Sequence, residues 1–318
     1  MKEGLVAGPV KESLTAEQRQ TSSYAALLVV QVLFGLFPVV AKTVLQPLGP
    51  LSPFPLLALR VGGAAFCLLA LHLVLVKNPV PIRQQFGTVS LLALLGVVLN
   101  MGLFMVGLQL TDPTEAVLVI TTIPVFTYGI AVLFGREKVG PKRVLGILLA
   151  IAGVVYLVGF HASPEHALGD VLVMGNALSY AAFLVLAKPT IEKYDPLSLT
   201  TWVFLLGALV FIPLGLLTGL RGEVAQLTTQ GVWRVVFIIL GPSVLTYVLN
   251  AVALRHVASS TVAIFTYVQP IFTAVAAYLL LDQTLNLRVI PAALLVFAGV
   301  WLVARRKPKV LEGAVIGD

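Results

Sequence analysis

The sequence predicts an all-α membrane protein whose ten transmembrane helices form an inverted five-plus-five repeat. Hydrophobic residues make up 58% of the chain and charged residues only 11%, against about 25% charged in a typical soluble domain. So few charges could not cover the surface of a water-soluble fold of 318 residues. The apolar residues also gather into runs of membrane-spanning length, and features of the first half recur in the second half.

A transmembrane helix needs about 20 mostly apolar residues, and ten segments meet that length. Short connections with helix breakers, such as Asp112-Pro113 and Gly140-Pro141, separate them. The first apolar run is too long for the hydrophobic region of a signal peptide, so we interpret it as a retained span. The predicted spans are residues 23–45, 53–76, 86–108, 114–134, 143–160, 169–187, 199–219, 232–254, 259–281 and 287–304.

The Lys and Arg residues lie mainly on one side of these spans. With the N-terminus in the cytoplasm, 16 of the 21 fall on the cytoplasmic side, three fall outside, and Lys42 and Arg60 fall within spans. The positive-inside rule therefore predicts that both termini are cytoplasmic, in a plasma membrane such as a bacterial inner membrane. Because the basic residues lie between apolar runs and not on one face, we expect no nucleic-acid binding.

A fixed offset of 146 residues matches the two halves of the chain. It places Ala41-Lys42 on Ala187-Lys188 and Pro124 on Pro270. Each half has five spans, an odd number, so the second half enters the membrane from the opposite side. Inverted repeats are typical of secondary transporters, because one fold in two orientations gives two states of nearly equal energy. We predict repeats over 23–160 and 161–305, between cytoplasmic tails 1–22 and 306–318.

One motif stands in both halves. The first copy reads Ile123-Pro124-Val125-Phe126-Thr127, then Phe134-Gly135-Arg136-Glu137; the second reads Gln269-Pro270-Ile271-Phe272-Thr273, then Asp282-Gln283. These residues resemble the EamA family of the drug/metabolite transporter superfamily, over roughly residues 25–305. Gln283 stands where the family usually has Glu. The resemblance implies ten helices around a central cavity and export of amino acids, related metabolites or drugs.

Polar and aromatic side chains share faces of several predicted spans. Polar groups in a bilayer are costly and usually face protein or water, so this set predicts a cavity for a small-molecule substrate. Helix-to-helix hydrogen bonding is the alternative for each residue. The candidate substrate-binding residues are Gln31, Phe34, Phe37, Asn100, Phe104, Thr121, Asn176, Tyr180, Phe183, Tyr247, Asn250, Tyr267 and Gln269.

Four further residues stand at matched positions. Pro124 and Pro270 fall near the middle of spans, where a proline frees a carbonyl one turn earlier, so both are candidate hinges; inherited packing is the alternative. Lys42 and Lys188 end the first and sixth spans, where they either snorkel to the headgroups or attract a carboxylate at the two mouths. We interpret Arg60, about two turns into the second span, as paired with backbone carbonyls; contact with the substrate is the alternative.

All 14 carboxylates of the chain fall in tails, loops or helix ends, so none is predicted at mid-membrane. Proton-coupled transporters and carriers of cations usually need such a group, and the small multidrug-resistance relatives carry one in their first span. We therefore expect efflux, by alternating access, of a neutral, zwitterionic or anionic organic solute. Facilitated movement or weak coupling fits this composition.

Two other functions are open to a chain of this kind. An intramembrane enzyme would need a buried acid–base pair, but His72 is the only histidine in a predicted span and has no acid in reach by sequence. The second is a non-transporting receptor or assembly subunit. The short connecting loops argue against it, because a scaffold would use extended soluble domains. We expect no enzyme. One cysteine, Cys67, and four scattered histidines predict no metal site and no cofactor, and the oligomeric state is not indicated.

Overall fold

A computed structural model describes residues 16–135, 140–159, 164–283 and 289–304, and every regular element among them is a helix. The predicted tail 306–318 and most of the tail 1–22 lie outside this part. The first half holds α1 (Ala16–Lys42), α2 (Pro53–Leu75), α3 (Ile82–Ala93), α4 (Asn100–Leu110), α5 (Pro113–Ile120), α6 (Ile123–Leu133) and α7 (Pro141–Gly159). The second half holds α8 (Pro164–Lys193), α9 (Pro196–Leu217), α10 (Leu220–Val224), α11 (Thr229–Ile239), α12 (Thr246–His256), α13 (Ser259–Ile264), α14 (Gln269–Leu281) and α15 (Val289–Ala304).

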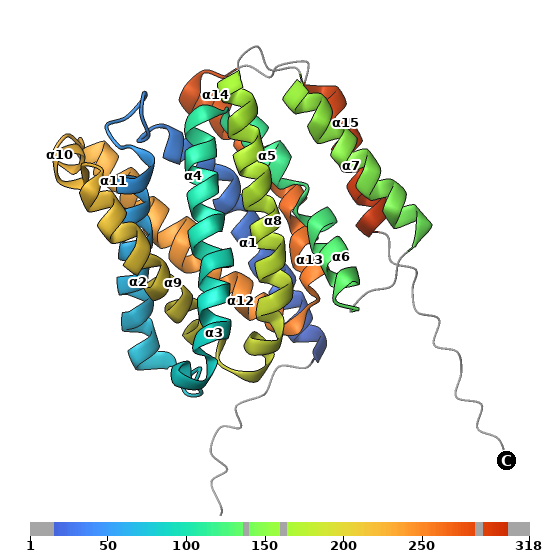
Figure 1. Ribbon diagram of the computed structural model, residues 1–318, viewed down its shortest axis with the longest axis horizontal. Coiled ribbons are helices and arrows are strands. Elements are labelled where there is room, and N and C mark those ends of the chain that lie inside the picture. Colours follow the sequence, from blue (N-terminus) through green and yellow to red (C-terminus); the bar gives the residue numbers. More distant parts are fainter. Residues whose placement is uncertain (1–15, 136–139, 160–163, 284–288, 305–318) are drawn as a thin grey trace, which may run out of the picture.

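These helices confirm the all-α membrane fold with two five-span halves. The spans are α1, α2, α3 with α4, α5 with α6, and α7, followed by α8, α9, α11 with α12, α13 with α14, and α15. Within the described residues, eight of them are long and apolar enough to cross a bilayer, and α7 and α15 supply the other two. These two pack against each other at one side of the bundle (Figure 1).

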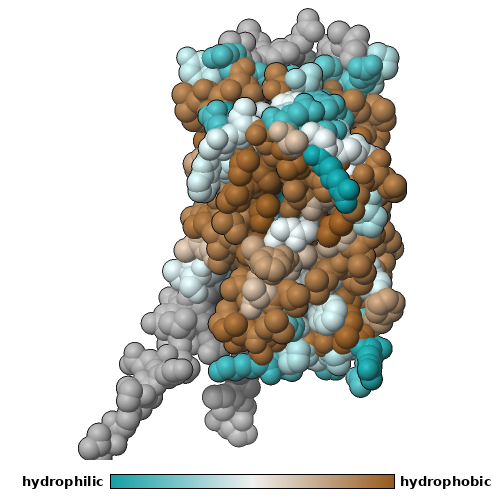
Figure 2. All heavy atoms as spheres, turned by 90° about the vertical axis from the view of Figure 1, so that its left-hand side faces the viewer, coloured by the Kyte–Doolittle hydropathy of each residue, from teal (hydrophilic) through white to brown (hydrophobic). Residues whose placement is uncertain are grey.

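The surface matches a bilayer environment. On the face that Figure 2 shows, a broad apolar band crosses the middle of the bundle, and most hydrophilic residues lie at its two ends. Large apolar side chains such as Phe66, Leu133 and Leu217 are more than 75% exposed, which a water-facing surface would not favour. The exposed side chains therefore face lipid.

The two ends of the bundle can be named by their matched lysines. The Lys42 end holds the carboxyl ends of α1, α4, α9 and α14 and the short helix α10, and lies at the top of Figure 1. The Lys188 end holds the carboxyl ends of α2, α6, α8 and α12 and lies at the bottom. The described part of the chain begins with α1 and finishes with α15 at the Lys188 end.

Two kinds of irregularity recur at equivalent positions. α3 and α4 are joined by a π-helical turn over Leu94–Leu99, and α11 and α12 by another over Leu240–Leu245, which is the same place under the offset of 146. The π turns were not predicted from the sequence. They interrupt the third and eighth spans near their middles, and the cavity-lining residues of these spans lie in the helices that follow the turns.

The fourth and ninth spans are broken just before the two prolines predicted as hinges. α5 ends at Ile120 and α6 starts at Ile123, so Pro124 is the second residue of the new helix. α13 is followed by a 3₁₀ turn over Phe265–Val268, and Pro270 is the second residue of α14. A proline in the first turn of a helix loses no hydrogen bond, which explains why the chain breaks there and not after it.

Candidate functional site

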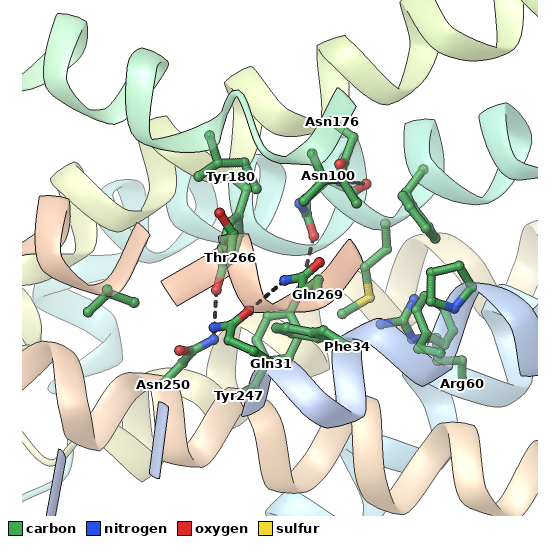
Figure 3. Close-up of a pocket in the computed structure, with 17 residues that line it drawn as sticks. Gln31, Phe34, Arg60, Asn100, Asn176, Tyr180, Tyr247, Asn250, Thr266 and Gln269 are labelled. Carbon is green, nitrogen blue, oxygen red and sulfur yellow. Dashed lines mark hydrogen bonds between the residues drawn. The ribbon is translucent and has the colours of Figure 1, made fainter. Parts of the chain in front are cut away.

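The middle of the bundle contains a cavity walled by both halves of the chain (Figure 3). It holds about 600 Å³ of space free of protein atoms, its opening included. Its lining residues are Gln31, Phe34, Phe37, Pro38, Arg60, Asn100, Met101, Phe104, Ile120, Ile123, Asn176, Tyr180, Tyr247, Asn250, Val262, Thr266 and Gln269.

Most of the residues proposed from helix faces meet at this cavity. The ones that line it are Gln31, Phe34, Phe37, Asn100, Phe104, Asn176, Tyr180, Tyr247, Asn250 and Gln269. They come from α1, α4, α8, α12 and α14, which are distant in sequence. Their role in substrate binding stays a prediction, but their convergence is what such a role requires.

Three candidates lie elsewhere. Thr121 is fully buried, and its hydroxyl donates to the carbonyl of Leu118 in the same helix. Tyr267 packs edge-on against Phe297 of α15, with ring centroids 6.1 Å apart. Phe183 lines a second, smaller cavity and stacks on Tyr180. The structure does not bring these three side chains to the central cavity.

Hydrogen bonds across the cavity join the two halves. The side-chain amide of Gln269 donates to Gln31 Oε1, which links α14 to α1. Tyr247 Oη donates to Asn100 Oδ1 over 3.0 Å, which links α12 to α4. These bonds hold the cavity walls at fixed separations, and the dashed lines of Figure 3 mark the contacts between the residues drawn.

Three side chains from other helices bind carbonyls of the first π turn and of α4, which follows it. Asn176 Nδ2 donates to the carbonyl of Asn100 and Ser179 Oγ to that of Leu95, both over 2.7 Å. Tyr247 Oη also lies 3.2 Å from the carbonyl oxygen of Gly96. A π turn leaves carbonyls unpaired within its own helix, so these contacts satisfy groups that would be costly in a bilayer. Helix-to-helix hydrogen bonding, the alternative considered for each polar residue, therefore accounts for part of the role of Asn176 and Tyr247.

Asn250 is the exception among these amides. Its Nδ2 donates to the hydroxyl oxygen of Tyr180 over 2.9 Å, but its Oδ1 is buried without a hydrogen-bond partner. The residue is 6% exposed and lines the cavity. A buried acceptor without a partner is expensive, so this oxygen favours a ligand that carries an N–H or O–H group.

Arg60 is the one charged residue among the described residues that line the cavity. Its side chain is 3% exposed, donates through Nε to Ser243 Oγ over 2.9 Å, and lies 4.0 Å from the ring centroid of Phe37. Ser243 in turn donates to the carbonyl of Ile238. Its hydrogen-bond partner is thus a serine side chain and not the backbone carbonyls expected from the sequence. The single Nε bond and the stacked ring orient the guanidinium at the cavity wall.

The two repeats contribute chemically different walls. At five equivalent positions under the offset of 146, both members line the cavity, and the first-repeat member is apolar while the second-repeat member is polar. These pairs are Phe34 and Tyr180, Met101 and Tyr247, Phe104 and Asn250, Ile120 and Thr266, and Ile123 and Gln269. The cavity is therefore amphipathic although its backbone is repeated.

The matched lysines bind helix ends. Lys42 Nζ donates to the carbonyls of Leu108, Gln109 and Thr111 at 2.7, 3.1 and 2.8 Å. Lys188 Nζ donates to the equivalent carbonyls of residues 254 and 257 at 2.8 and 2.9 Å. An ammonium at a helix carboxyl end pairs with unsatisfied carbonyls and with the helix dipole. Their predicted part in attracting a solute stays a prediction.

Within the described part of the chain, no three His, Cys, Asp or Glu side chains lie close enough together to hold a metal ion. Among the described carboxylates, that of Asp170 is fully buried, near the Lys42 end, and accepts a hydrogen bond from Thr111 over 2.8 Å. It does not line the central cavity.

Comparisons with known proteins agree with this architecture. The chain is 30% identical to an uncharacterized transporter of Archaeoglobus fulgidus over 71% of its length and 79% of the relative's. It is 26% identical to the uncharacterized transporter YetK of Bacillus subtilis over 84% and 82% of the two chains. A crystal structure of a protein with 18% sequence identity has the same fold, with a TM-score of 0.61 over 91% of this chain and 98% of that one.

The repeat found in the sequence is also the repeat of a family. The model of the EamA-like transporter family matches twice, once over residues 21–159 and again over residues 167–305. Together the two matches include every residue that lines the cavity. The chain therefore belongs to the EamA-like transporter family.

Proposed function

We propose that this transporter exports a small anionic or zwitterionic organic solute through the central cavity by alternating access. One observation carries the choice of solute: Arg60 brings a positive charge to the cavity, and no described lining residue brings a negative one. A buried charge without a partner is unfavourable, so a carboxylate or similar group is the complement that this site lacks. The earlier expectation also included neutral solutes, which would leave the guanidinium unpaired.

Arg60 is suited to bind a carboxylate directly. A guanidinium presents parallel N–H groups that match the two oxygens of a carboxylate, and such paired bonds are among the strongest in proteins. Ser243 and the ring of Phe37 hold the side chain from the side, so little conformational entropy is lost when the solute binds. We propose that the anionic group of the solute binds here.

The part of the cavity near Asn250 favours a solute group that donates a hydrogen bond. Ser243 and Asn250 are seven residues apart on one span, which is about 10 Å along a helix axis. Because Arg60 is bonded to Ser243, its guanidinium and the free Oδ1 of Asn250 lie toward different ends of the cavity. A solute with a carboxylate at one end and an N–H or O–H group several ångströms away would satisfy both.

The broken spans support movement by alternating access. Discontinuous helices frame the substrate site in many repeat-built transporters, and here both breaks contribute lining residues, Ile120 and Ile123 from one and Thr266 and Gln269 from the other. We propose Pro124 and Pro270 as hinges on this ground. The charge bias of the sequence supports an orientation with the Lys188 end in the cytoplasm of a plasma membrane.

Transport is favoured over catalysis by the composition of the cavity. Its described lining contains amides, hydroxyls, rings and one guanidinium, but no histidine or carboxylate that could act as a general base. The relatives named above are called transporters, which supports the same choice. We therefore propose that the chain is not an enzyme.

The test is a ligand screen followed by flux measurements. Purified protein is heated with carboxylic acids, amino acids, organic cations and neutral sugars, because a ligand at 100 times its Kd stabilises the folded state by about 2.7 kcal/mol. We expect stabilisation by carboxylates, and counterflow of the same compounds in proteoliposomes without steep dependence on a proton gradient. Selective stabilisation by cations, or flux driven steeply by protons, would contradict the proposal.

A further inference from the structure

A second cavity lies between α8, α9 and α12, toward the Lys188 end of the bundle. It holds about 340 Å³ of space free of protein atoms, its opening included, and is walled mainly by apolar side chains such as Phe183, Leu199 and Val203. None of its described lining residues is charged. We call this space the Lys188-end compartment.

The repeat explains where this compartment comes from. Five of its lining residues are equivalent, under the offset of 146, to first-repeat residues that line the central cavity. The pairs are Tyr180 and Phe34, Phe183 and Phe37, Leu184 and Pro38, Tyr247 and Met101, and Asn250 and Phe104. The compartment is therefore the counterpart of the part of the central cavity that faces the Lys42 end. In the first repeat this space is joined to the centre, and in the second repeat it is separate.

Three residues form the partition between the two spaces. Tyr180, Tyr247 and Asn250 line both the central cavity and the compartment. Tyr247 is fixed to Asn100 on α4, whereas the 2.9 Å bond from Asn250 Nδ2 to Tyr180 Oη joins α12 to α8. The equivalent first-repeat residues, Phe34 and Phe104, cannot form such a bond. A polar contact thus closes the second repeat where the first repeat is open.

The compartment leads away from the partition to a lysine. Leu254 lines it, and the carbonyl oxygen of the same residue accepts a hydrogen bond from Lys188 Nζ over 2.8 Å. A solute that crossed the partition would pass apolar walls toward the end of the bundle where Lys188 lies. Leu108, the first-repeat equivalent of Leu254, accepts a hydrogen bond from Lys42 Nζ in the same way.

We propose that the Lys188-end compartment is a second solute site, which takes the apolar part of the solute, and that the hydrogen bond between Asn250 and Tyr180 is its gate. The inference rests on the transport function proposed above. In an inverted repeat the two halves exchange shapes, so the compartment enlarges when its counterpart toward the Lys42 end contracts. Breaking the bond shifts the population toward the state that is open at the Lys188 end.

A cysteine reporter tests the gate without any solute. Thr200 lines the compartment and is 4% exposed, so Thr200→Cys, made with Cys67→Ala, reports access from one side. Vesicles of both orientations are treated with a membrane-impermeant maleimide. Lys77→Cys and Gln226→Cys, at exposed positions of the two ends, identify which end faces the reagent.

We expect slow labelling of Thr200→Cys from the Lys188 end and faster labelling, by about two- to tenfold, when Tyr180→Phe removes the gate bond. Tyr278→Phe, at a 65% exposed lipid-facing position, removes the same atom and should leave the rate unchanged. Asn250→Leu breaks the bond from the other side and should act like Tyr180→Phe. Equal rates in the wild-type background and in both gate variants would overturn the gate.

The compartment itself is tested by filling it. Ala251 lines the compartment and not the central cavity, so Ala251→Phe should lower flux about tenfold. The Kd of a small carboxylate that binds Arg60 in the central cavity should stay the same. Unchanged flux in this variant would overturn the second site. Failure of the gate can be distinguished from failure of the proposed function. Faster labelling of Thr200→Cys in the Tyr180→Phe background supports the gate even if the protein binds no carboxylate.

Discussion

The first and second repeats present the same backbone to the cavity and different chemistry. Phe34, Met101 and Phe104 of the first repeat are apolar, and their second-repeat equivalents are two tyrosines and an asparagine. Their helices share π turns and proline breaks at matched places. The repeated backbone thus allows two conformations of similar energy. The unequal side chains of the two walls orient an asymmetric solute in the cavity. Substitutions at three sets of matched positions test this comparison.

The largest expected effect concerns the lysines at the two ends. Lys42→Met should lower the free energy of unfolding by about 1.5–3 kcal/mol, since hydrogen bonds to charged groups contribute that much and three carbonyls lose their donor. Lys188→Met should cost less, because Lys188 binds two carbonyls and its ion pair with Glu192 is partly exposed. Thermal unfolding in detergent measures both. Lys77→Met, in an exposed loop, is the control, and an equal or greater loss in Lys188→Met would contradict the comparison.

A smaller loss of stability is expected when the hydrogen bond between Gln269 and Gln31, which joins the two walls, is removed. Gln269→Ile copies Ile123 from the first repeat and leaves the buried amide of Gln31 without its partner, which should cost about 1 kcal/mol of stability. Adding Gln31→Leu removes the unpaired amide, so the double variant should recover most of that loss. Unfolding of the single and double variants measures the difference. A double variant as unstable as Gln269→Ile would show that the bond is not the cause.

The smallest effect is expected at Thr266, which matches Ile120. Its hydroxyl donates to the carbonyl of Ala263 in its own helix, over 2.8 Å, so it joins no other span. Thr266→Ile should change the free energy of unfolding by about 0.6 kcal/mol or less, the average for a polar contact in a membrane protein. Solute affinity, measured by thermal shift, should change by about threefold at most. A large loss of binding would identify Thr266 as a direct solute contact.

Much of the fold could be predicted from the sequence. Hydropathy is read from one segment at a time, and the repeat is found by comparing the sequence with itself. The ten spans and the inverted repeat need no knowledge of which helices touch. The sequence did not predict the π turns, because in the first of them the carbonyls of Leu95 and Gly96 are bound by Ser179 and Tyr247 from other helices. Such long-range partners leave no periodic trace in the chain.

Long-range contacts also explain why two side chains of the candidate site lie differently from what the sequence predicts. Tyr267 shares a face with Gln269 in a regular helix, but it lies in a 3₁₀ turn, whose three residues per turn rotate it toward Phe297. Arg60 was assigned to backbone carbonyls because its partner, Ser243, is 183 residues away. A lone charge two turns inside a span was the signal that could have identified it as a site residue.

The central claim is that Arg60 selects the anionic group of the solute. Arg60→Leu gives the first repeat the residue of its second-repeat equivalent, Leu206, and Arg221→Gln removes an exposed arginine as the control. The measurement is the Kd of a carboxylic acid and of its primary amide for each protein. We expect the wild type and the control to bind the acid at least about 30-fold more tightly, and Arg60→Leu to bind both alike. A preference for the acid that survives in Arg60→Leu would contradict the account.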